Sequence, residues 1–299
     1  MEILNPKEFT DYEIIDSGNY KKLERFGLFI LSRPEPQAVW DPQLSEKEWK
    51  DKLHAEFVRD KANPEKGIWT LKSTMKEQWF VRYKFNDLNL KFRLGLSGFK
   101  HVGIFPEQAP NWNYIYEKIS AMKTEKPKVL NLFAYTGGAS IAAKAAGAEV
   151  VHVDSVKQVI SWARENMEAS ELTDIRWVVE DALKFVKREV KRGNKYNGII
   201  LDPPAYGRGP DGERWIIEEH LNEILKLCAE LIEPTEHFYI LNLYAIGFSA
   251  VIVETLIHRI YGDVKNLEIG ELVVEDLFHK KLPLSIYGRF SNLQISGQR

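Results

Sequence analysis

Cysteine is almost absent from this chain, which has one among its 299 residues. A single thiol cannot form an internal disulfide, so a disulfide-stapled secreted scaffold is excluded and a reducing, cytoplasmic location is expected. Residues 1–20 lack the basic start and unbroken apolar core of a signal peptide. No stretch approaches the roughly 20 apolar residues that span a bilayer. We therefore expect no membrane partner.

An excess of charge of either sign is also lacking. The chain has 41 Lys and Arg against 43 Asp and Glu, a formal net charge of −2. No global field therefore attracts nucleic acid or an anionic membrane. Internal repeats and low-complexity runs are absent too. With 44% hydrophobic and 28% charged residues, the composition is that of a globular protein with a buried core. The length allows one large domain or, as we expect, two.

The first part of the chain has the pattern of short strands. Apolar and polar residues alternate in Glu24–Ser32 and Trp79–Leu96, between Gly and Asn-Asp turn signals. One helix is expected after the capping box Ser45–Glu48. This pattern predicts a small β-rich α+β domain over residues 1–108.

Strands and helices alternate in the remainder. Strands are predicted to begin near five positions: Val129, Glu149, Ile175, Tyr196 and His237. Ser155 and Asp181 are expected to cap the helices that follow two of them. Such alternation gives right-handed crossovers and a mostly parallel sheet, and Asn266–Asp276 and Leu282–Gln294 form a reversed hairpin at its end. For 109–299 we predict an α/β, Rossmann-like, doubly wound, seven-stranded mixed sheet whose last strand is antiparallel.

A glycine turn follows the first of these strands. The apolar run Val129–Tyr135 breaks at Thr136–Gly138 and continues as a helix of small residues. A dinucleotide-binding loop needs a third spaced glycine, which is missing, so a nicotinamide cofactor is disfavoured. Asp154 and Asp202 stand at two further strand ends. The pattern predicts a nucleotide-like ligand at the carboxyl edge of an open α/β sheet.

These motifs resemble one enzyme family when they are taken in order. The segments are His101–Gln108, Asn131–Gly138, Val153–Asp154, Glu180–Ala182 and Leu201–Tyr206. Together they resemble the class I S-adenosylmethionine (SAM) methyltransferases, and more closely the bacterial branch related to the large-subunit ribosomal RNA methyltransferases. The resemblance runs from about residue 95 to the C-terminus and implies SAM as cofactor, S-adenosylhomocysteine as product, and no metal.

The resemblance also implies cofactor contacts. Gly137 and Gly138 let the backbone approach the methionine part of SAM, Asp154 accepts from the ribose hydroxyls, and Asp181 and Ala182 bind the adenine. The implied set is Phe105, Gln108, Asn131, Phe133, Ala134, Tyr135, Thr136, Gly137, Gly138, Asp154, Ser155, Asp181, Ala182 and Asp202. The alternative is that the aspartates only cap helices and the glycine turn is only a tight corner.

The predicted reaction centre is Asp202, Pro203, Pro204 and Tyr206. Two prolines fix the loop, the carboxylate accepts from an amino group, and the phenol ring stacks on a base; alternatively, this is a rigid turn with a packed tyrosine. Relatives that methylate carbon 5 of cytosine need a cysteine at a strand end, whereas Cys228 lies in a helical pattern and is expected to fill the core. Nitrogen methylation is predicted, with the choice between an exocyclic amine and a ring nitrogen left open.

Segment 66–105 has eight Lys and Arg against two acids, interleaved with aromatics. With the loop 206–215, which offers Arg208, Arg214 and Trp215, it is a predicted RNA-binding surface. For the segment, the alternative is a small β-domain whose aromatics form its core and whose lysines face water. For the loop, the alternative is that Arg208, Arg214 and Trp215 are only a solvated face. The RNA-binding PUA module of many of these relatives is not expected here, which counts against ribosomal RNA.

The predicted function is that of a SAM-dependent methyltransferase acting on a nitrogen of an RNA base, as in ribosomal RNA, without a covalent cysteine intermediate. One rival is the same site acting on a small molecule or a protein. A second rival is a non-catalytic RNA-binding protein that retains the SAM pocket. Salt-sensitive substrate binding separates RNA from a small molecule. The oligomeric state is left open.

Overall fold

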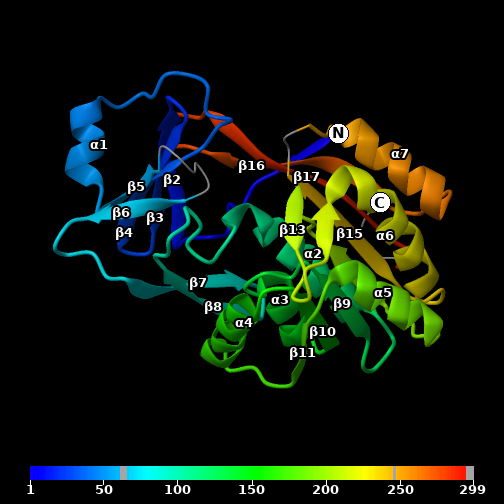
Figure 1. Cartoon of the computed structure of the whole chain (residues 1–299). Coiled ribbons are helices and arrows are strands. Elements are labelled where there is room, and N and C mark those ends of the chain that lie inside the picture. The colour runs from blue at the N-terminus through cyan, green and yellow to red at the C-terminus, as the bar shows by residue number, and fades with distance from the viewer. Residues whose placement is uncertain (61–65, 245–246, 294–299) are drawn as a thin grey trace. The chain divides into compact units, whose positions relative to one another are not determined.

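The structure is a computed structural model that describes residues 1–60, 66–244 and 247–293 (Figure 1). Its contacts divide the chain into two compact units. The large unit comprises Met1–Leu4, Pro110–Leu272 and Ser285–Arg299, and the small unit comprises Asn5–Ala109 and Val273–Leu284. Within the described part of the chain, no helix is both long and apolar enough to cross a membrane.

The large unit contains an eight-stranded sheet in the order β1-β16-β17-β15-β12-β9-β10-β11. Its strands are β1 (Glu2–Leu4), β9 (Lys128–Leu132), β10 (Glu149–Asp154), β11 (Ile175–Val179), β12 (Gly198–Leu201), β15 (Phe238–Tyr244), β16 (Glu268–Glu275) and β17 (Lys281–Ser291). The five strands from β15 to β11 run parallel, and β17 is antiparallel to β15. The predicted mixed Rossmann-like sheet is confirmed.

Two details of the predicted sheet need correction. The sheet has eight strands rather than seven, because β1 pairs in parallel with β16 at its edge. Three residues are too few to show an alternating pattern, so this strand is not predicted from the sequence. The last strand ends at Ser291, short of the predicted end at Gln294, a residue that lies outside the described part.

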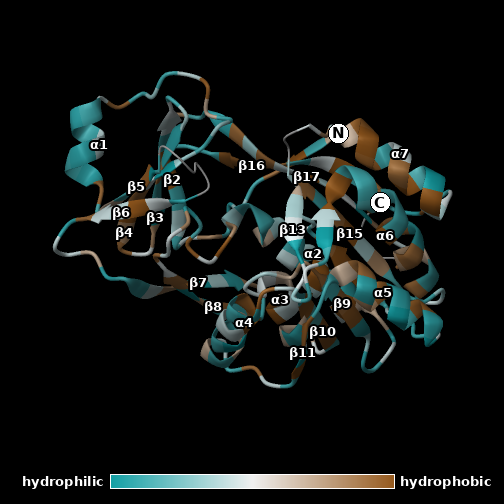
Figure 2. Ribbon diagram, viewed as in Figure 1, coloured by the Kyte–Doolittle hydropathy of each residue, from teal (hydrophilic) through white to brown (hydrophobic). Residues whose placement is uncertain are grey.

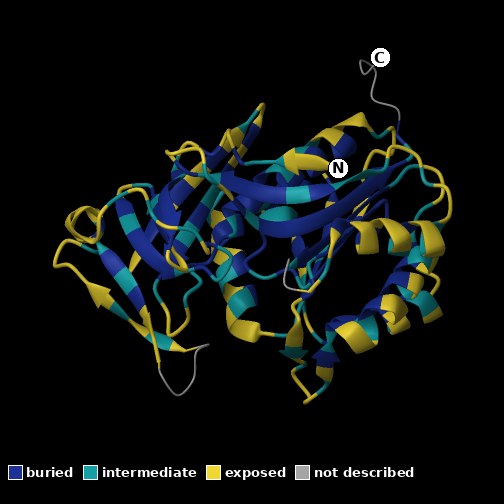
Figure 3. Ribbon diagram, turned by 90° about the horizontal axis from the view of Figure 1, so that it is seen from above, coloured by how far each residue is buried: buried dark blue, intermediate teal, exposed yellow. Residues whose placement is uncertain are grey.

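Helices cover both faces of this sheet, as a doubly wound fold requires. They are α2 (Ala109–Ala121), α3 (Gly138–Ala145), α4 (Lys157–Ala169), α5 (Ala182–Lys191), α6 (Ile217–Leu231) and α7 (Ala250–Tyr261). Leu132 and Leu241 on one face belong to one apolar cluster with residues of α5, α6 and α7. On the opposite face, the ring of Phe238 meets Tyr114 of α2. Figure 3 shows the strands as mostly buried and the helices as exposed on one side.

The small unit is built on a five-stranded sheet in the order β2-β3-β4-β5-β6. Its strands and helix are β2 (Tyr12–Gly18), β3 (Lys21–Phe26), β4 (Phe29–Pro34), α1 (Glu46–Lys52), β5 (Ala55–Arg59) and β6 (Gly67–Leu71). The predicted capping box is confirmed: Glu48 N–H donates to the Ser45 hydroxyl, and Ser45 N–H donates to the Glu48 carboxylate. Helix α1 is largely hydrophilic (Figure 2) and buries Trp49.

A separate hairpin of β7 (Gln78–Phe85) and β8 (Leu88–Gly95) completes the strands of the small unit within the described residues. Trp79, Tyr83 and Phe92 on one face of the hairpin are buried. These aromatics therefore form core, as the alternative interpretation of segment 66–105 predicted. On the other face the β7 side chains are exposed, whereas Lys91 and Arg93 of β8 are half-buried.

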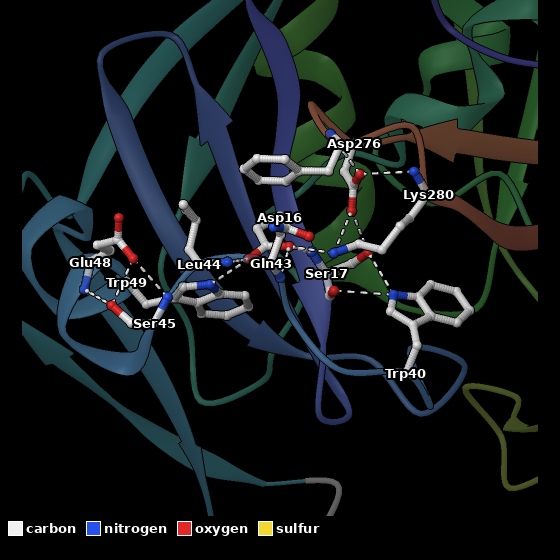
Figure 4. A network of polar contacts seen from close by, with 11 residues as sticks. Asp16, Ser17, Trp40, Gln43, Leu44, Ser45, Glu48, Trp49, Asp276 and Lys280 are labelled. Carbon is white, nitrogen blue, oxygen red and sulfur yellow. Dashed lines mark hydrogen bonds and ion pairs between the residues drawn. The ribbon is translucent and has the colours of Figure 1, made fainter.

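The carboxylate of Asp16 is fully buried and holds three segments of the small unit together (Figure 4). It accepts hydrogen bonds from the backbone N–H of Gln43 and Leu44, from the Trp49 indole at 2.9 Å, and from the Lys280 ammonium at 2.6 Å. Burial by itself raises the pKa of this group, but the hydrogen bonds outweigh it and hold the pKa of Asp16 below its ordinary value.

Replacing Asp16→Asn should lower the free energy of unfolding by about 2–3 kcal/mol near neutral pH, because hydrogen bonds to a charged acceptor are lost. A carboxyl whose folded pKa is lowered stabilises the fold above its unfolded pKa, and this contribution disappears as pH falls through the folded pKa. Urea unfolding at neutral and acidic pH measures both effects. The exposed Asp51→Asn is the matched control, and equal pH dependence of wild type and Asp16→Asn would contradict the assignment.

Candidate active site

The loop between β9 and α3 has an unusual backbone. Phe133 has φ of +55°, Tyr135 +48° and Gly137 +87°. The first two carry side chains that resist the left-handed region, so this conformation costs free energy and persists only because neighbouring groups fix it. Ala134 N–H donates to the Val153 carbonyl at 3.1 Å and ties the loop to β10. A strained loop at a strand end is typical of a ligand-binding site.

Both glycines of the turn are required by the structure. Gly137 is the N-cap of α3 in the left-handed region and supplies no side-chain cap, so the first amides of the helix have no side-chain acceptor from this position. At Gly138 a Cβ would stand 2.8 Å from the indole of Trp112. The sequence pattern did not reveal Trp112, which comes from α2 and is distant along the chain.

Asp154 at the end of β10 joins two loops. One carboxylate oxygen accepts from Tyr135 N–H and the other from Val156 N–H, each at 2.9 Å. Burial raises the pKa of Asp154, and these amides partly oppose the shift. The backbone N–H of Ser155 also hydrogen-bonds this carboxylate. A carboxylate has about four acceptor positions, so these three amides still leave room for a hydroxyl group. The prediction that Ser155 caps the next helix is wrong: Val156 is the N-cap and has no side-chain cap bond. The chain runs one residue further before it turns into α4.

The predicted cap at Asp181 is confirmed. Its Oδ1 accepts from Lys184 N–H at 2.9 Å, and both Asp181 and Ala182 are buried at the start of α5. The alternative of a capping role is therefore correct for this aspartate as far as Oδ1 is concerned. Capping by one oxygen does not occupy the other, so the cap and a ligand role are compatible.

A buried polar row lies beneath the glycine turn. Asn131 Nδ2 donates to Ser140 Oγ at 2.9 Å, and Ser140 Oγ is hydrogen-bonded to His152 Nδ1 at 3.0 Å. Asn166 Nδ2 donates to the Thr136 carbonyl at 2.9 Å. Burial lowers the pKa of His152 to about 3, so the imidazole is neutral near pH 7. Of these five, the sequence prediction named Asn131 and Thr136; a polar residue between apolar neighbours on a strand was the available sign of His152.

The Asp-Pro-Pro segment follows directly on β12. Asp202 is partly exposed, Pro203 is buried and Pro204 is exposed. Tyr206 is 52% exposed, and its hydroxyl accepts from Arg208 Nε at 3.0 Å. The ring of Tyr206 is therefore not part of the core. A ring half open to solvent, beside a carboxylate on a proline-fixed loop, is able to contact a flat substrate.

The loop 206–215 has regular secondary structure. It contains β13 (Tyr206–Arg208) paired with β14 (Arg214–Ile216). Trp215 is buried, and its indole donates to the Pro204 carbonyl at 2.7 Å, so the prediction that it grips a base is wrong. Its ring also contacts Phe133, with centroids 4.7 Å apart. Trp215 thus links the Asp-Pro-Pro segment to the strained loop.

Strand order brings most of the predicted site together. β12, β9, β10 and β11 are adjacent and parallel, so their carboxyl ends lie at one edge of the sheet. The predicted residues at this edge are Asn131, Phe133, Ala134, Tyr135, Thr136, Gly137, Gly138, Asp154, Ser155, Asp181, Ala182, Asp202, Pro203, Pro204 and Tyr206. Phe105 and Gln108 belong instead to the small unit, at the short helix Pro106–Gln108. Their cofactor role stays a prediction. Among the described residues, no cluster of His, Cys, Asp or Glu is suited to a metal ion.

Cys228 lies fully buried in α6 among the apolar residues of the core. Burial raises the pKa of its thiol well above the ordinary value, so the thiolate is scarce. The prediction that this cysteine fills the core is confirmed.

The glycine turn into α3 and the two acids at the ends of β10 and β11 define a nucleotide-binding α/β enzyme of the class I methyltransferase type. The chain belongs to the S-adenosylmethionine-dependent methyltransferase family, whose model matches residues 57–264. SAM is therefore the cofactor. The site fits it: the turn has glycine at two positions where a side chain would be strained or crowded, the first amides of α3 suit a carboxylate, and Asp154 can accept from hydroxyl groups.

Solved structures agree with this assignment. A SAM-dependent methyltransferase from Agrobacterium tumefaciens is 36% identical, with a TM-score of 0.88 over 97% of this chain and 93% of that chain. A putative SAM-dependent methyltransferase from Streptococcus mutans shares the fold, with 16% identity and a TM-score of 0.70 over 94% of this chain and 76% of that one.

Curated relatives share part of the chain. The ribosomal RNA large subunit methyltransferase K/L of Shewanella frigidimarina is 30% identical over 152 residues, which are 50% of this chain and 20% of the relative. A putative ribosomal RNA large subunit methyltransferase of Methanocaldococcus jannaschii is 34% identical over 123 residues, 40% of this chain and 30% of the relative. The match thus spans less than a third of either relative.

Asp154→Ala should weaken SAM binding by about 1–3 kcal/mol, because the unmade hydrogen bonds involve a charged acceptor. Isothermal titration with SAM measures the change. Asp263→Ala, at an exposed position, is the control. The SAM affinity of Asp154→Asn, which retains one carbonyl acceptor, should lie between that of Asp154→Ala and that of the control. Unchanged affinity in a folded Asp154→Ala would refute the ribose role.

Proposed function

We propose that this methyltransferase transfers the methyl group of SAM to a nitrogen of an RNA base, of the kind found in large-subunit ribosomal RNA, with no covalent cysteine intermediate. The observation that carries this proposal is the Asp202–Pro203–Pro204 loop with the half-exposed Tyr206 beside it. The single cysteine of the chain, Cys228, is buried in α6, which supports nitrogen rather than cytosine carbon 5 as the acceptor.

When bound, SAM supplies a methyl group on a sulfonium, which an acceptor nitrogen attacks in line as the carbon–sulfur bond breaks. Positive charge is dispersed in this step, so alignment of the reactants is the main source of catalysis and can contribute of order 7–11 kcal/mol. Asp202 accepts an N–H of the acceptor group and aims its lone pair. Pro203 and Pro204 fix the carboxylate, and Tyr206 stacks on the base.

The same proposal assigns the cofactor contacts. Gly137 and Gly138 admit the methionine part of SAM, whose carboxylate meets the first amides of α3. Asp154 accepts from the ribose hydroxyls. Asp181 accepts from the adenine amino group, and Ala182 N–H donates to the ring. The other members of this set are Phe105, Gln108, Asn131, Phe133, Ala134, Tyr135, Thr136, Ser155 and Asp202.

RNA is the proposed partner, bound through segment 66–105 and the loop 206–215. The names of the curated relatives support this choice. So does the exposure of Arg208 and Arg214 on the two short strands of the loop. Lys184 pairs with Asp211 and Glu213 at the tip, so that part of the loop is held to α5 and has its own acidic groups. Within the loop 206–215, phosphate contacts are therefore assigned to Arg208 and Arg214.

Asp202→Ala should abolish turnover and leave SAM affinity nearly unchanged, because the carboxylate holds the acceptor, whereas its contact with the cofactor is only one among many. Mass spectrometry of ribosomal RNA nucleosides measures turnover, in cells that lack the gene and are complemented with wild type or variant. A methylated purine should be missing without the gene, return with wild type, and stay missing with Asp202→Ala. Equal loss of SAM affinity and turnover would remove Asp202 from the chemistry.

Cys228→Ala should retain full turnover in the same complementation, since a buried thiol in α6 takes no part in the reaction. The free energy of unfolding should fall by about 1 kcal/mol, as for a typical small core truncation. Loss of methylation in a Cys228→Ala protein that is still folded would restore the covalent mechanism.

A further inference from the structure

The hairpin of β7 and β8 has two unlike faces. Side chains alternate between the faces along each strand, and the inward set, including Trp79, Tyr83 and Phe92, is buried. The outward set of seven residues is Gln78, Phe80, Arg82, Lys84, Asn89, Lys91 and Arg93. We call this set the outer face of the hairpin. It contains four cations and no acid.

Strand register concentrates these charges. Arg82 lies directly opposite Lys91, and Phe80 lies opposite Arg93. Like charges at directly opposed positions destabilise a strand pair. A polyanionic ligand that binds beside Arg82 and Lys91 reduces this repulsion.

An exposed aromatic ring stands among the cations. Phe80 is 49% exposed, and the ammonium of Lys91 lies 4.6 Å from its ring centroid. A phenyl ring half open to water gains free energy when a flat apolar group covers it. Cations along a strand with an aromatic ring between them are the arrangement that binds the backbone and bases of single-stranded nucleic acid.

We propose that the outer face of the β7–β8 hairpin binds single-stranded RNA, with Arg82 and Lys84 on consecutive phosphates and Phe80 stacked on a base. The proposal rests on the proposed function for the presence of RNA and adds the surface that holds it. Arg82 and Lys84 are two residues apart on β7, so their side chains emerge on one face about 6.6–6.8 Å apart. A base of a duplex is already stacked, so a stacking contact by Phe80 favours a single strand.

The test is binding of a labelled mixed-sequence single-stranded RNA of about 16 nucleotides. This length is the upper end of what one OB-fold domain covers on a single strand. Fluorescence anisotropy over a range of salt concentrations compares the wild type with Phe80→Ala and with the double variant Arg82→Gln/Lys84→Gln. The control is Lys47→Gln/Lys52→Gln, which removes the same charge from exposed positions on α1 in the same unit. SAM titration and thermal unfolding of each variant check the site and the fold.

The double variant should reduce the slope of log affinity against log salt by about 1.4, since each phosphate contact on a single strand contributes about 0.7. Phe80→Ala should weaken binding by about 5- to 150-fold, as for loss of one base stack, and leave the slope unchanged. SAM affinity should not change in either, and the α1 control should bind RNA as wild type does.

RNA binding by wild type that both hairpin variants retain would overturn this inference and leave the proposed function intact. Absence of RNA binding by wild type overturns the inference, and an unchanged nucleoside spectrum in cells lacking the gene is the separate failure of the proposed function. Hairpin-dependent binding of an acidic peptide or of duplex RNA in preference to the single strand would also overturn it.

Discussion

Two hydrogen bonds from backbone amides to the carboxylate of Asp154 fix the two loops that precede α3 and α4 at the edge of the large sheet. One amide belongs to Tyr135, in a loop whose positive φ angles cost free energy, and the other belongs to Val156, ahead of α4. Because the carboxylate is rigidly placed by β10, it fixes both loops relative to each other. The position of the glycine turn before α3 and the position of the start of α4 both depend on Asp154.

The strained loop is supported from two further sides. Beneath it, Asn131, Ser140 and His152 form a neutral hydrogen-bonded row, which places no charge in the interior. Beside it, Trp215 contacts Phe133 and holds the carbonyl of Pro204. The cofactor loop and the Asp-Pro-Pro loop therefore share a rigid support. This matters for a reaction in which alignment contributes most of the rate.

Asp16 and Asp154 differ in a way that follows from their partners. Asp16 has an ammonium group and four N–H donors and keeps a lowered pKa, whereas Asp154 has amide donors and a raised pKa. The ion pair of Asp16 with Lys280 connects β2 to the turn that follows β16. Asp16 therefore acts as a structural cross-link, while Asp154 has acceptor capacity left for a ligand.

The sequence by itself determined the alternation of strands and helices, the glycine turn, the capping residues Ser45 and Asp181, and the burial of Cys228. These depend on local periodicity, backbone freedom and short-range hydrogen bonds, which are written in neighbouring residues. Tertiary structure alone decided the roles of Trp112 and Trp215 and the addition of β1 as an eighth strand. Those outcomes depend on contacts between residues far apart along the chain, and no local pattern encodes which of two equally apolar or aromatic side chains another segment will cover.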